Sequence, residues 1–288
     1  MTLPSSADPA GDSGWAQHHP RVGFFTDTSL CIGCKACEVA CKEWNQVPHD
    51  GFVFSATSYD NTGALGADTW RHVTFKEKLV PAAAGDEVRW LMSSDVCKHC
   101  TDAACLDVCP TGALFRTEHG TVVVQDDVCN GCGYCVPACP FGVIDQRRGD
   151  GRVWKCTLCY DRIGAGMTPA CAQACPTESI QFGPLDQLRA AADGRVTALR
   201  SSGAPEARLY GADPTDGVGG MGAFFLLLDD PETYGLPPDP VVTTRDLASI
   251  WRTAGVAAVA VVATVAGAVV AGTPLRRPLR GPLGPGRR

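Results

Sequence analysis

The sequence predicts an α+β fold that is rich in loops and ends in one transmembrane helix. Three observations support this prediction. Sixteen of the 288 residues are cysteines in four groups of four, 32 glycines and 21 prolines limit regular elements to short ones, and 19 consecutive residues near the C-terminus carry no charge. With 45% apolar residues the chain can bury a core, whereas its net charge of −6 argues against nucleic acid as a partner.

The spacing of the cysteines points to iron–sulfur clusters. Groups one and three read C-x2-C-x2-C-x3-C, and proline follows the last cysteine of groups two, three and four. This is the bacterial ferredoxin pattern, in which three thiolates of one run and a fourth from a partner run hold each [4Fe-4S] cubane. The groups are Cys31, Cys34, Cys37 and Cys41; Cys97, Cys100, Cys105 and Cys109; Cys129, Cys132, Cys135 and Cys139; and Cys156, Cys159, Cys171 and Cys175.

Two other uses of cysteine fit this spacing less well. A four-cysteine zinc site has two separated C-x2-C pairs and does not need a third cysteine at the same step. A disulfide framework would require four dense thiol clusters to pair off without any sign of secretion. Groups two and four contain insertions and would be ambiguous alone, but they are not ambiguous as members of a fourfold repeat. A structural or zinc-binding cysteine-rich protein is kept as an alternative of a different class.

Crosswise sharing of ligands predicts which groups pair. Groups two and three flank a predicted hairpin of residues 114–124 and would form one unit, which leaves groups one and four as an outer unit of a nested double ferredoxin-like domain. Pairing of group one with group two is also topologically possible. The nested arrangement predicts cluster A on Cys31, Cys34, Cys37 and Cys175; cluster B on Cys156, Cys159, Cys171 and Cys41; cluster C on Cys97, Cys100, Cys105 and Cys139; and cluster D on Cys129, Cys132, Cys135 and Cys109.

The remaining segments follow from composition and periodicity. Strands are predicted at 71–75 and 87–92, an amphipathic helix at 185–200, and a buried strand at 223–228. A G-x-G-x-x-G match at 217–222 is interpreted as a loop, because polar residues precede it and a strand follows it. The predicted organisation is a flexible leader at 1–22, the four-cluster domain at 23–184, a wrapping segment and linker at 185–245, a transmembrane helix at 246–273 and a basic cytoplasmic tail at 274–288.

The charge-free run at 254–272 contains eight alanines and seven valines. At about 1.5 Å per residue it spans roughly 28 Å of helix, close to the thickness of a bilayer core. The residues after it include five arginines and no acid, so the positive-inside rule places the tail in the cytoplasm and the cluster domain on the outer face. A buried core helix is the alternative interpretation.

Several other residues lie beside the cysteines. His99 is expected to pack or hydrogen-bond near its cluster rather than bind metal, because the cysteine sets are complete without it. Lys35, Lys98 and Lys155 each flank a cysteine and either tune a cluster potential or stay solvated. The sequence contains no recognisable acid–base pair, nucleophile or phosphate loop, which predicts an electron conductor and not a catalyst.

The chain resembles the four-cluster β subunits of membrane-bound respiratory molybdenum or tungsten enzymes, most closely those of formate dehydrogenase. Cys132 supports this resemblance, because respiratory nitrate reductase β subunits carry tryptophan at the matching place. The segments after Cys175 and the C-terminal helix favour formate dehydrogenase. The similar segments are 31–41, 43–45, 131–135, 139–141, 155–159, 161–162, 169–171, 209–210, 217–220 and 234–237.

The resemblance implies a non-catalytic electron-transfer subunit with four [4Fe-4S] clusters. It implies two partners, a catalytic α subunit with a molybdenum or tungsten pterin that oxidises formate, and a cytochrome b γ subunit that reduces quinone. It also implies a single-pass protein of the cell membrane. The equivalent subunit of a membrane-bound hydrogenase or of a sulfur-compound reductase is the nearest alternative.

Overall fold

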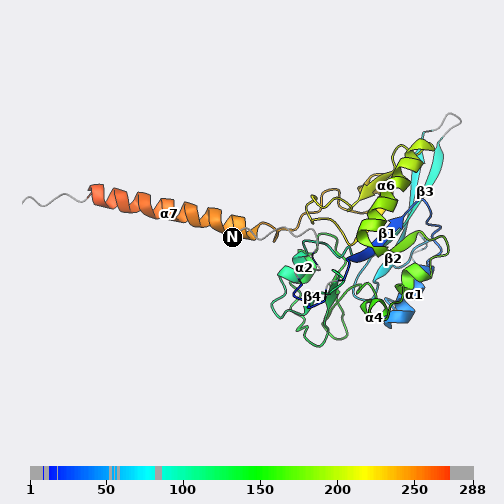
Figure 1. Cartoon of the computed structure of the whole chain (residues 1–288), viewed down its shortest axis with the longest axis horizontal. Coiled ribbons are helices and arrows are strands. Elements are labelled where there is room, and N and C mark those ends of the chain that lie inside the picture. Colours follow the sequence, from blue (N-terminus) through cyan, green and yellow to red (C-terminus); the bar gives the residue numbers. More distant parts are fainter. Residues whose placement is uncertain are drawn as a thin grey trace, which may run out of the picture. The chain divides into compact units, whose positions relative to one another are not determined.

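A computed structural model describes residues 9, 13–17, 19–51, 54, 56, 59–81 and 86–272 of the chain. The chain divides into two compact units, Met1–Arg245 with all the cysteines and Asp246–Arg288 with the C-terminal helix. The predicted basic tail at 274–288 lies outside the described residues, as does most of the predicted leader. Figure 1 shows the elements of both units.

A four-stranded sheet forms the centre of the first unit. Its strand order is β8 (Ile180–Pro184), β1 (Val22–Asp27), β10 (Ala223–Leu227) and β9 (Arg208–Tyr210). Strands β1 and β10 run parallel, and the two outer strands are antiparallel to their neighbours. All five residues of β10 are buried, as expected for a continuous apolar strand covered on both faces. The predicted strand at 223–228 is confirmed and ends one residue earlier.

Helix α6 (Leu185–Ser201) packs against β1 (Figure 1). Its buried side chains, Leu185, Leu188, Ala192 and Val196, recur at three- and four-residue intervals and lie on one stripe. They join β10 in one apolar core. The predicted helix at 185–200 is therefore confirmed.

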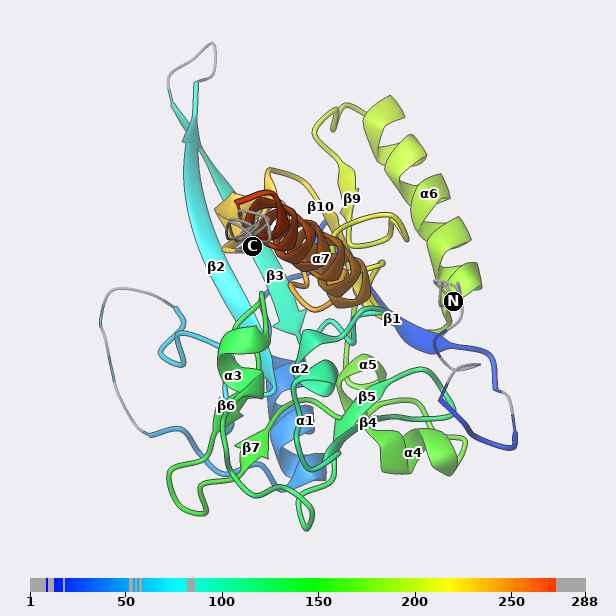
Figure 2. The ribbon, with the colours of Figure 1, turned by 90° about the vertical axis from the view of Figure 1, so that its left-hand side faces the viewer.

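Strands β2 (Arg71–Val80) and β3 (Glu87–Val96) form a long antiparallel hairpin (Figure 2). The strands predicted at 71–75 and 87–92 are present, and each is longer than expected. The additional residues of β2 are mostly exposed and include charged side chains, so they lacked an apolar pattern. One of them, Lys78, lies on the hairpin's outer half and donates from Nζ to Asp229 Oδ1 at 2.8 Å.

Short helices carry many of the cysteines. Helix α1 (Ala36–Asn45) packs against α5 (Ala170–Gln173), and α2 (Ala104–Asp107) packs against α3 (Cys135–Ala138). The first pair joins groups one and four, and the second pair joins groups two and three. The described helices are therefore arranged in the nested order and not in the sequential one.

Small connecting elements complete this region. Strands β4 (Leu114–Arg116) and β5 (Val122–Val124) form the hairpin predicted between groups two and three. A second hairpin, β6 (Asp145–Gln146) with β7 (Val153–Trp154), was not predicted. Helix α4 (Tyr160–Gly164) follows it, and the 3-10 helix η1 (Pro231–Tyr234) follows β10. The G-x-G-x-x-G segment at 217–222 is a loop, as predicted.

The end of the predicted leader belongs to the folded unit. Strand β1 begins at Val22, and the neighbouring Arg21 is buried and donates from Nη1 to Thr101 Oγ1 at 2.8 Å. Earlier in the chain, Trp15 Nε1 donates to the carbonyl of Arg116 at 2.9 Å. Residues near the end of the predicted leader therefore contact the domain through hydrogen bonds, which leave no apolar pattern in the sequence.

Helix α7 (Leu247–Gly272) forms the described part of the second unit. It begins seven residues before the charge-free run. The most apolar 18 residues within Ser249–Gly272 have a mean hydropathy of 2.4, and this is the single described helix long and apolar enough to cross a membrane. None of its most apolar stretch is buried within the chain, so the core-helix interpretation does not fit.

Candidate iron–sulfur centres

The structure brings the sixteen cysteines together as free thiols, with no disulfide among them. Two cavities are each lined by four cysteines from two different groups. The first is lined by Cys31, Cys34, Cys37 and Cys175. The second is lined by Cys97, Cys100, Cys105 and Cys139. Each foursome combines three cysteines of one run with the last cysteine of another.

The other eight thiols also have electrostatic neighbours in a second cysteine group. Burial raises the pKa of Cys41 well above its ordinary value, and the nearby thiols of Cys156, Cys171 and Cys159 raise it further. Burial likewise raises the pKa of Cys135 to about 11, and its thiol neighbours are Cys109, Cys132 and Cys129. Thiols crowded in apolar surroundings resist ionisation, so they need a cationic metal centre to become the thiolates that bind iron.

Each foursome suits a cluster better than a single ion. Among the described residues, no three His, Cys, Asp or Glu side chains converge closely enough to hold one metal ion. Zinc would draw its thiolates to about 2.3 Å from one centre, whereas a cubane separates its ligands over several atoms. The sixteen soft donors therefore fit four [4Fe-4S] clusters.

Left-handed backbone turns aim the cysteines of groups one and three. Gly33 and Lys35, which flank Cys34, have φ values of 67° and 59°, and Gly131 and Gly133, which flank Cys132, have φ values of 71° and 74°. Glycine adopts this conformation without a steric cost. A Cβ atom at position 131 would lie 2.5 Å from the carbonyl oxygen of Gly151, so close backbone approach also requires glycine there.

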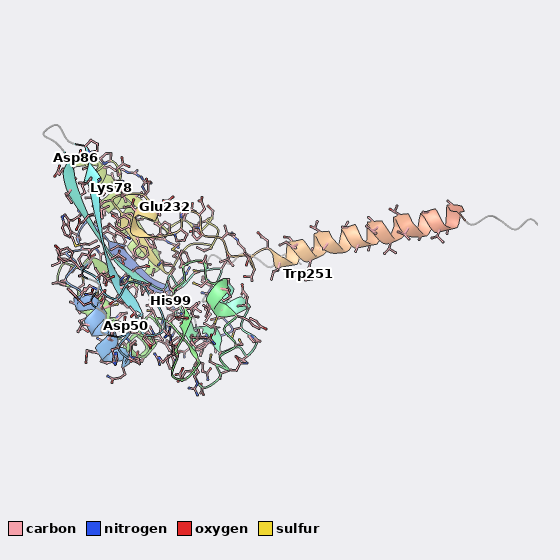
Figure 3. The ribbon with its side chains drawn as sticks, turned by 180° about the vertical axis from the view of Figure 1, so that it is seen from behind. Asp50, Lys78, Asp86, His99, Glu232 and Trp251 are labelled. Carbon is pink, nitrogen blue, oxygen red and sulfur yellow. The ribbon has the colours of Figure 1, made fainter. Side chains whose placement is uncertain are left out.

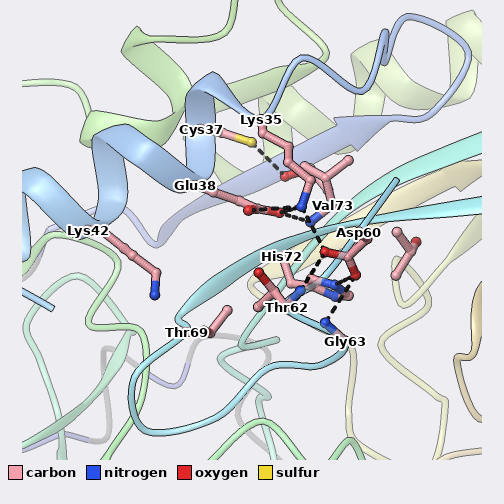
Figure 4. Close-up of polar contacts among 12 residues, drawn as sticks. Lys35, Cys37, Glu38, Lys42, Asp60, Thr62, Gly63, Thr69, His72 and Val73 are labelled. Atoms are coloured by element: carbon pink, nitrogen blue, oxygen red, sulfur yellow. Dashed lines mark hydrogen bonds and ion pairs between the residues drawn. The ribbon is translucent and has the colours of Figure 1, made fainter. Parts of the chain in front are cut away.

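A charged network secures the start of α1 (Figure 4). Lys35 Nζ lies 2.8 Å from Asp60 Oδ1 and 3.3 Å from Glu38 Oε2. Asp60 also contacts His72 Nε2, and Glu38 accepts a hydrogen bond from the Val73 backbone. These bonds connect helix α1 with the long insertion after it and with strand β2. They therefore stabilise the segment that carries the cysteines of group one.

Asp60 provides a test of this network. Burial alone would raise the pKa of Asp60, but hydrogen bonds from Lys35 and His72 outweigh it and lower the pKa to about 2. Because the folded-state pKa lies below the ordinary value, this stabilisation is present above about pH 4 and disappears as the pH falls toward 2. We expect Asp60→Asn to reduce stability at pH 7 by about 1 kcal/mol, measured as a lower midpoint of thermal unfolding.

The same measurement on Asp126→Asn is the control, because the ion pair of Asp126 with Arg152 is exposed on both sides. That variant should unfold at the wild-type temperature. An Asp60→Asn protein as stable as the wild type at pH 7 would show that the network does not support α1.

The lysines and the histidine that flank cysteines differ in their burial and in their hydrogen-bond partners. Lys155 is buried and donates to Cys97 Sγ at 3.6 Å. Lys98 is also buried but forms an ion pair with Asp95, and Lys35 is partly exposed. His99 lies in the interior (Figure 3), where its Nδ1 accepts a hydrogen bond from the Val122 backbone at 3.1 Å. His99 therefore packs and hydrogen-bonds, as predicted.

Two further residues that sequence reasoning did not assign to the site bind cysteine sulfurs. Arg71 Nη2 donates to Cys171 Sγ at 3.3 Å. Asn45 Nδ2 lies 3.7 Å from Cys41 Sγ and 3.8 Å from Cys159 Sγ. The sequence signal for Arg71 was an arginine at the start of a predicted strand, because a charge at a buried position needs a partner.

Comparisons with known proteins agree with this site. Two family models described as 4Fe-4S dicluster domains match residues 30–113 and 88–185. The chain is 41% identical to the formate dehydrogenase iron-sulfur subunit of Haemophilus influenzae over 240 residues, covering 82% of this chain and 74% of that protein. It is 40% identical to the nitrate-inducible formate dehydrogenase iron-sulfur subunit of Escherichia coli over 255 residues, covering 86% and 83%.

A third relative matches a shorter part of the chain. This relative belongs to the anaerobic dimethyl sulfoxide reductase of Escherichia coli and is 39% identical over 172 residues, which is 59% of this chain and 76% of that protein. Two dicluster domains account for four [4Fe-4S] clusters, in agreement with the sixteen cysteines. The cofactor prediction is confirmed, and the zinc alternative is not supported.

Proposed function

The chain belongs to the family of formate dehydrogenase iron–sulfur subunits, and we propose that it is the non-catalytic conductor between two partners. It would take electrons from an α subunit that oxidises formate at a molybdenum or tungsten pterin. It would pass them to a cytochrome b γ subunit that reduces quinone. The observation that carries this proposal is the arrangement of sixteen cysteines as four neighbouring foursomes.

The proposed ligand sets follow the nested pattern. A [4Fe-4S] cluster, when bound, accepts and releases one electron. The chain's own part is to supply the thiolates, to exclude water and to keep neighbouring sets close. We assign Cys31, Cys34, Cys37 and Cys175 to cluster A; Cys156, Cys159, Cys171 and Cys41 to B; Cys97, Cys100, Cys105 and Cys139 to C; and Cys129, Cys132, Cys135 and Cys109 to D.

Electrostatic interactions between thiols of different sets support the order A, B, C, D. The thiol of Cys37 in set A interacts electrostatically with Cys171 in set B. Cys156 in set B interacts in the same way with Cys97 in set C, and Cys105 in set C with Cys135 in set D. Each set is thus near enough to the next for its thiols to affect one another's pKa.

The two ends of this series are open to solvent. Cys34 of set A and Cys132 of set D are the two exposed cysteines, and the other fourteen are buried or half-buried. Apolar side chains are exposed beside both ends, including Ile32 near set A and Tyr134 near set D. Exposed apolar groups at such places suit contact with a partner protein. We propose that electrons enter at one end and leave at the other.

Helix α7 would anchor the subunit in the membrane. Its 24-residue apolar stretch is long enough to cross a bilayer core, and the arginines that follow it in the sequence favour a cytoplasmic C-terminus. The proposed location of the four-cluster unit is therefore the extracytoplasmic face.

Purification of the tagged chain from anaerobically prepared membranes tests these partners. We expect it to carry with it a pterin-containing subunit and a b-type haem, and to have its clusters reduced by added formate. Hydrogen and dimethyl sulfoxide serve as controls for the two alternative complexes, a membrane-bound hydrogenase and a sulfur-compound reductase. Reduction by hydrogen but not by formate, or oxidation of the reduced clusters by dimethyl sulfoxide, would assign the chain to a different complex.

A further inference from the structure

Arg71 lies between cysteines that we assign to clusters A and B. Its Nη2 donates to Cys171 Sγ of set B at 3.3 Å, and its Nη1 donates to Ser94 Oγ at 3.3 Å. Ser94 Oγ in turn lies 3.2 Å from Cys37 Sγ of set A. The guanidinium, stacked 4.9 Å from the centre of the Phe24 ring, therefore joins ligands of two clusters.

Lys155 lies in the same way between cysteines that we assign to clusters B and C. Its Nζ donates to Cys97 Sγ of set C at 3.6 Å and to the backbone carbonyl of Cys156 of set B at 3.0 Å. A third hydrogen bond goes to the Val122 carbonyl, so all three ammonium protons are used. The ammonium is held between ligand residues of two clusters, as the guanidinium of Arg71 is.

These two charges have no carboxylate to balance them among the described residues. Arg71 and Lys155 are only 1% and 2% exposed, and their side-chain nitrogens bond to sulfur, hydroxyl and carbonyl atoms. An unpaired buried cation is costly, which indicates that the cluster ligands themselves are its counterions.

We infer that Arg71 raises the reduction potentials of clusters A and B, and that Lys155 raises those of clusters B and C. A cubane with four thiolates is anionic and gains one more negative charge on reduction, so a nearby buried cation favours the reduced form. Cluster B receives both contributions and cluster D receives neither. This inference rests on the proposed function and concerns the chain's own charges.

Redox titration of the purified complex, followed by electron paramagnetic resonance, tests the inference. We expect Arg71→Met to lower two of the four potentials and Lys155→Met to lower two, with one couple common to both variants. Each affected couple should lose about tenfold in its reduced-to-oxidised ratio at a fixed potential, which is about 59 mV for one electron. The double variant, with both Arg71→Met and Lys155→Met, should lower the potential of the common couple by the sum of the two single shifts.

Lys78→Met is the matched control, because Lys78 is a cation on the same strand as Arg71 but is 43% exposed and pairs through Nζ with Asp229 at 2.8 Å instead of with a cysteine. It should leave all four potentials nearly unchanged. Arg71→Lys and Lys155→Arg keep the charge and should restore the wild-type potentials in proteins with full iron content.

Three results would overturn the inference. The potentials could stay unchanged in both neutral variants, all four could shift equally, or iron could be lost in the neutral variants and retained in the charge-keeping ones. The last result would mean that the cations serve cluster assembly instead. A wild-type complex with fewer than four reducible couples would instead contradict the proposed function, so the two failures are distinguishable.

Discussion

Replacing Cys156 with alanine is expected to remove one whole cluster and to abolish electron transfer from formate to quinone. Cys156 is buried in set B, and its thiol interacts with Cys97 of set C and with Cys171 of its own set. Without it, the inner link between sets A and C is missing. Iron should fall from roughly sixteen to roughly twelve atoms per chain, measured by metal analysis beside the rate of quinone reduction.

Two controls identify the cause of that loss. Formate oxidation with an artificial acceptor that takes electrons directly from the α subunit should persist. Cys41→Ala should remove the same resonance signal, although Cys41 lies 115 positions earlier in the chain, because it belongs to the same proposed set. Loss of a different signal in Cys41→Ala, or full quinone reduction in Cys156→Ala, would contradict the nested ligand sets.

Ending the chain after Arg245 is expected to move it from the membrane fraction to the soluble fraction. Residues 1–245 form a compact unit by themselves, and the described apolar span lies wholly beyond them. The shortened chain should keep its iron, since all sixteen cysteines remain. The measurement is the distribution of the chain between washed membranes and supernatant when it is produced without its partners.

A point substitution sharpens this test. Val262→Arg places a charge near the middle of the apolar span, which costs about 2.5–3.5 kcal/mol for insertion, whereas Val262→Leu keeps the span apolar. The first should weaken membrane association and the second should not. A shortened chain that stays with the membranes would show that α7 is not the anchor.

The sequence predicted those parts of the site that depend on local spacing. Cysteines at successive three-residue steps can converge on one cluster, and crosswise sharing supplies the fourth ligand, so the foursomes could be proposed without a structure. Helix α6 and strand β10 were predicted because their buried side chains recur with a regular period or form a continuous apolar run. The hairpin of β4 and β5 followed from two apolar runs around a turn.

Features that depend on distant contacts were not predicted. Strand β1 pairs with β8 and with β10 far along the chain, and no local pattern encodes such neighbours. The outer half of β2 is exposed and charged, so its length was underestimated. Lys35 and Lys155 look alike in sequence, since each follows or precedes a cysteine, and only burial distinguishes them.

The order of the clusters also needed the structure. Spacing predicts which thiols share a cluster, but not which clusters are neighbours. The electrostatic interactions of Cys37 with Cys171 and of Cys156 with Cys97 supply that information. The place of Arg71 depends on distant contacts, with Cys171 of group four directly and with Cys37 of group one through Ser94, which its own sequence does not reveal.

The central claim is that this chain holds four reducible [4Fe-4S] clusters arranged as a conductor. Iron analysis with a reductive titration of the anaerobically purified complex, followed by electron paramagnetic resonance, tests it most directly. We predict roughly sixteen irons per chain, four one-electron couples and magnetic coupling between neighbours. Zinc in place of iron, or only one or two reducible clusters, would contradict the account.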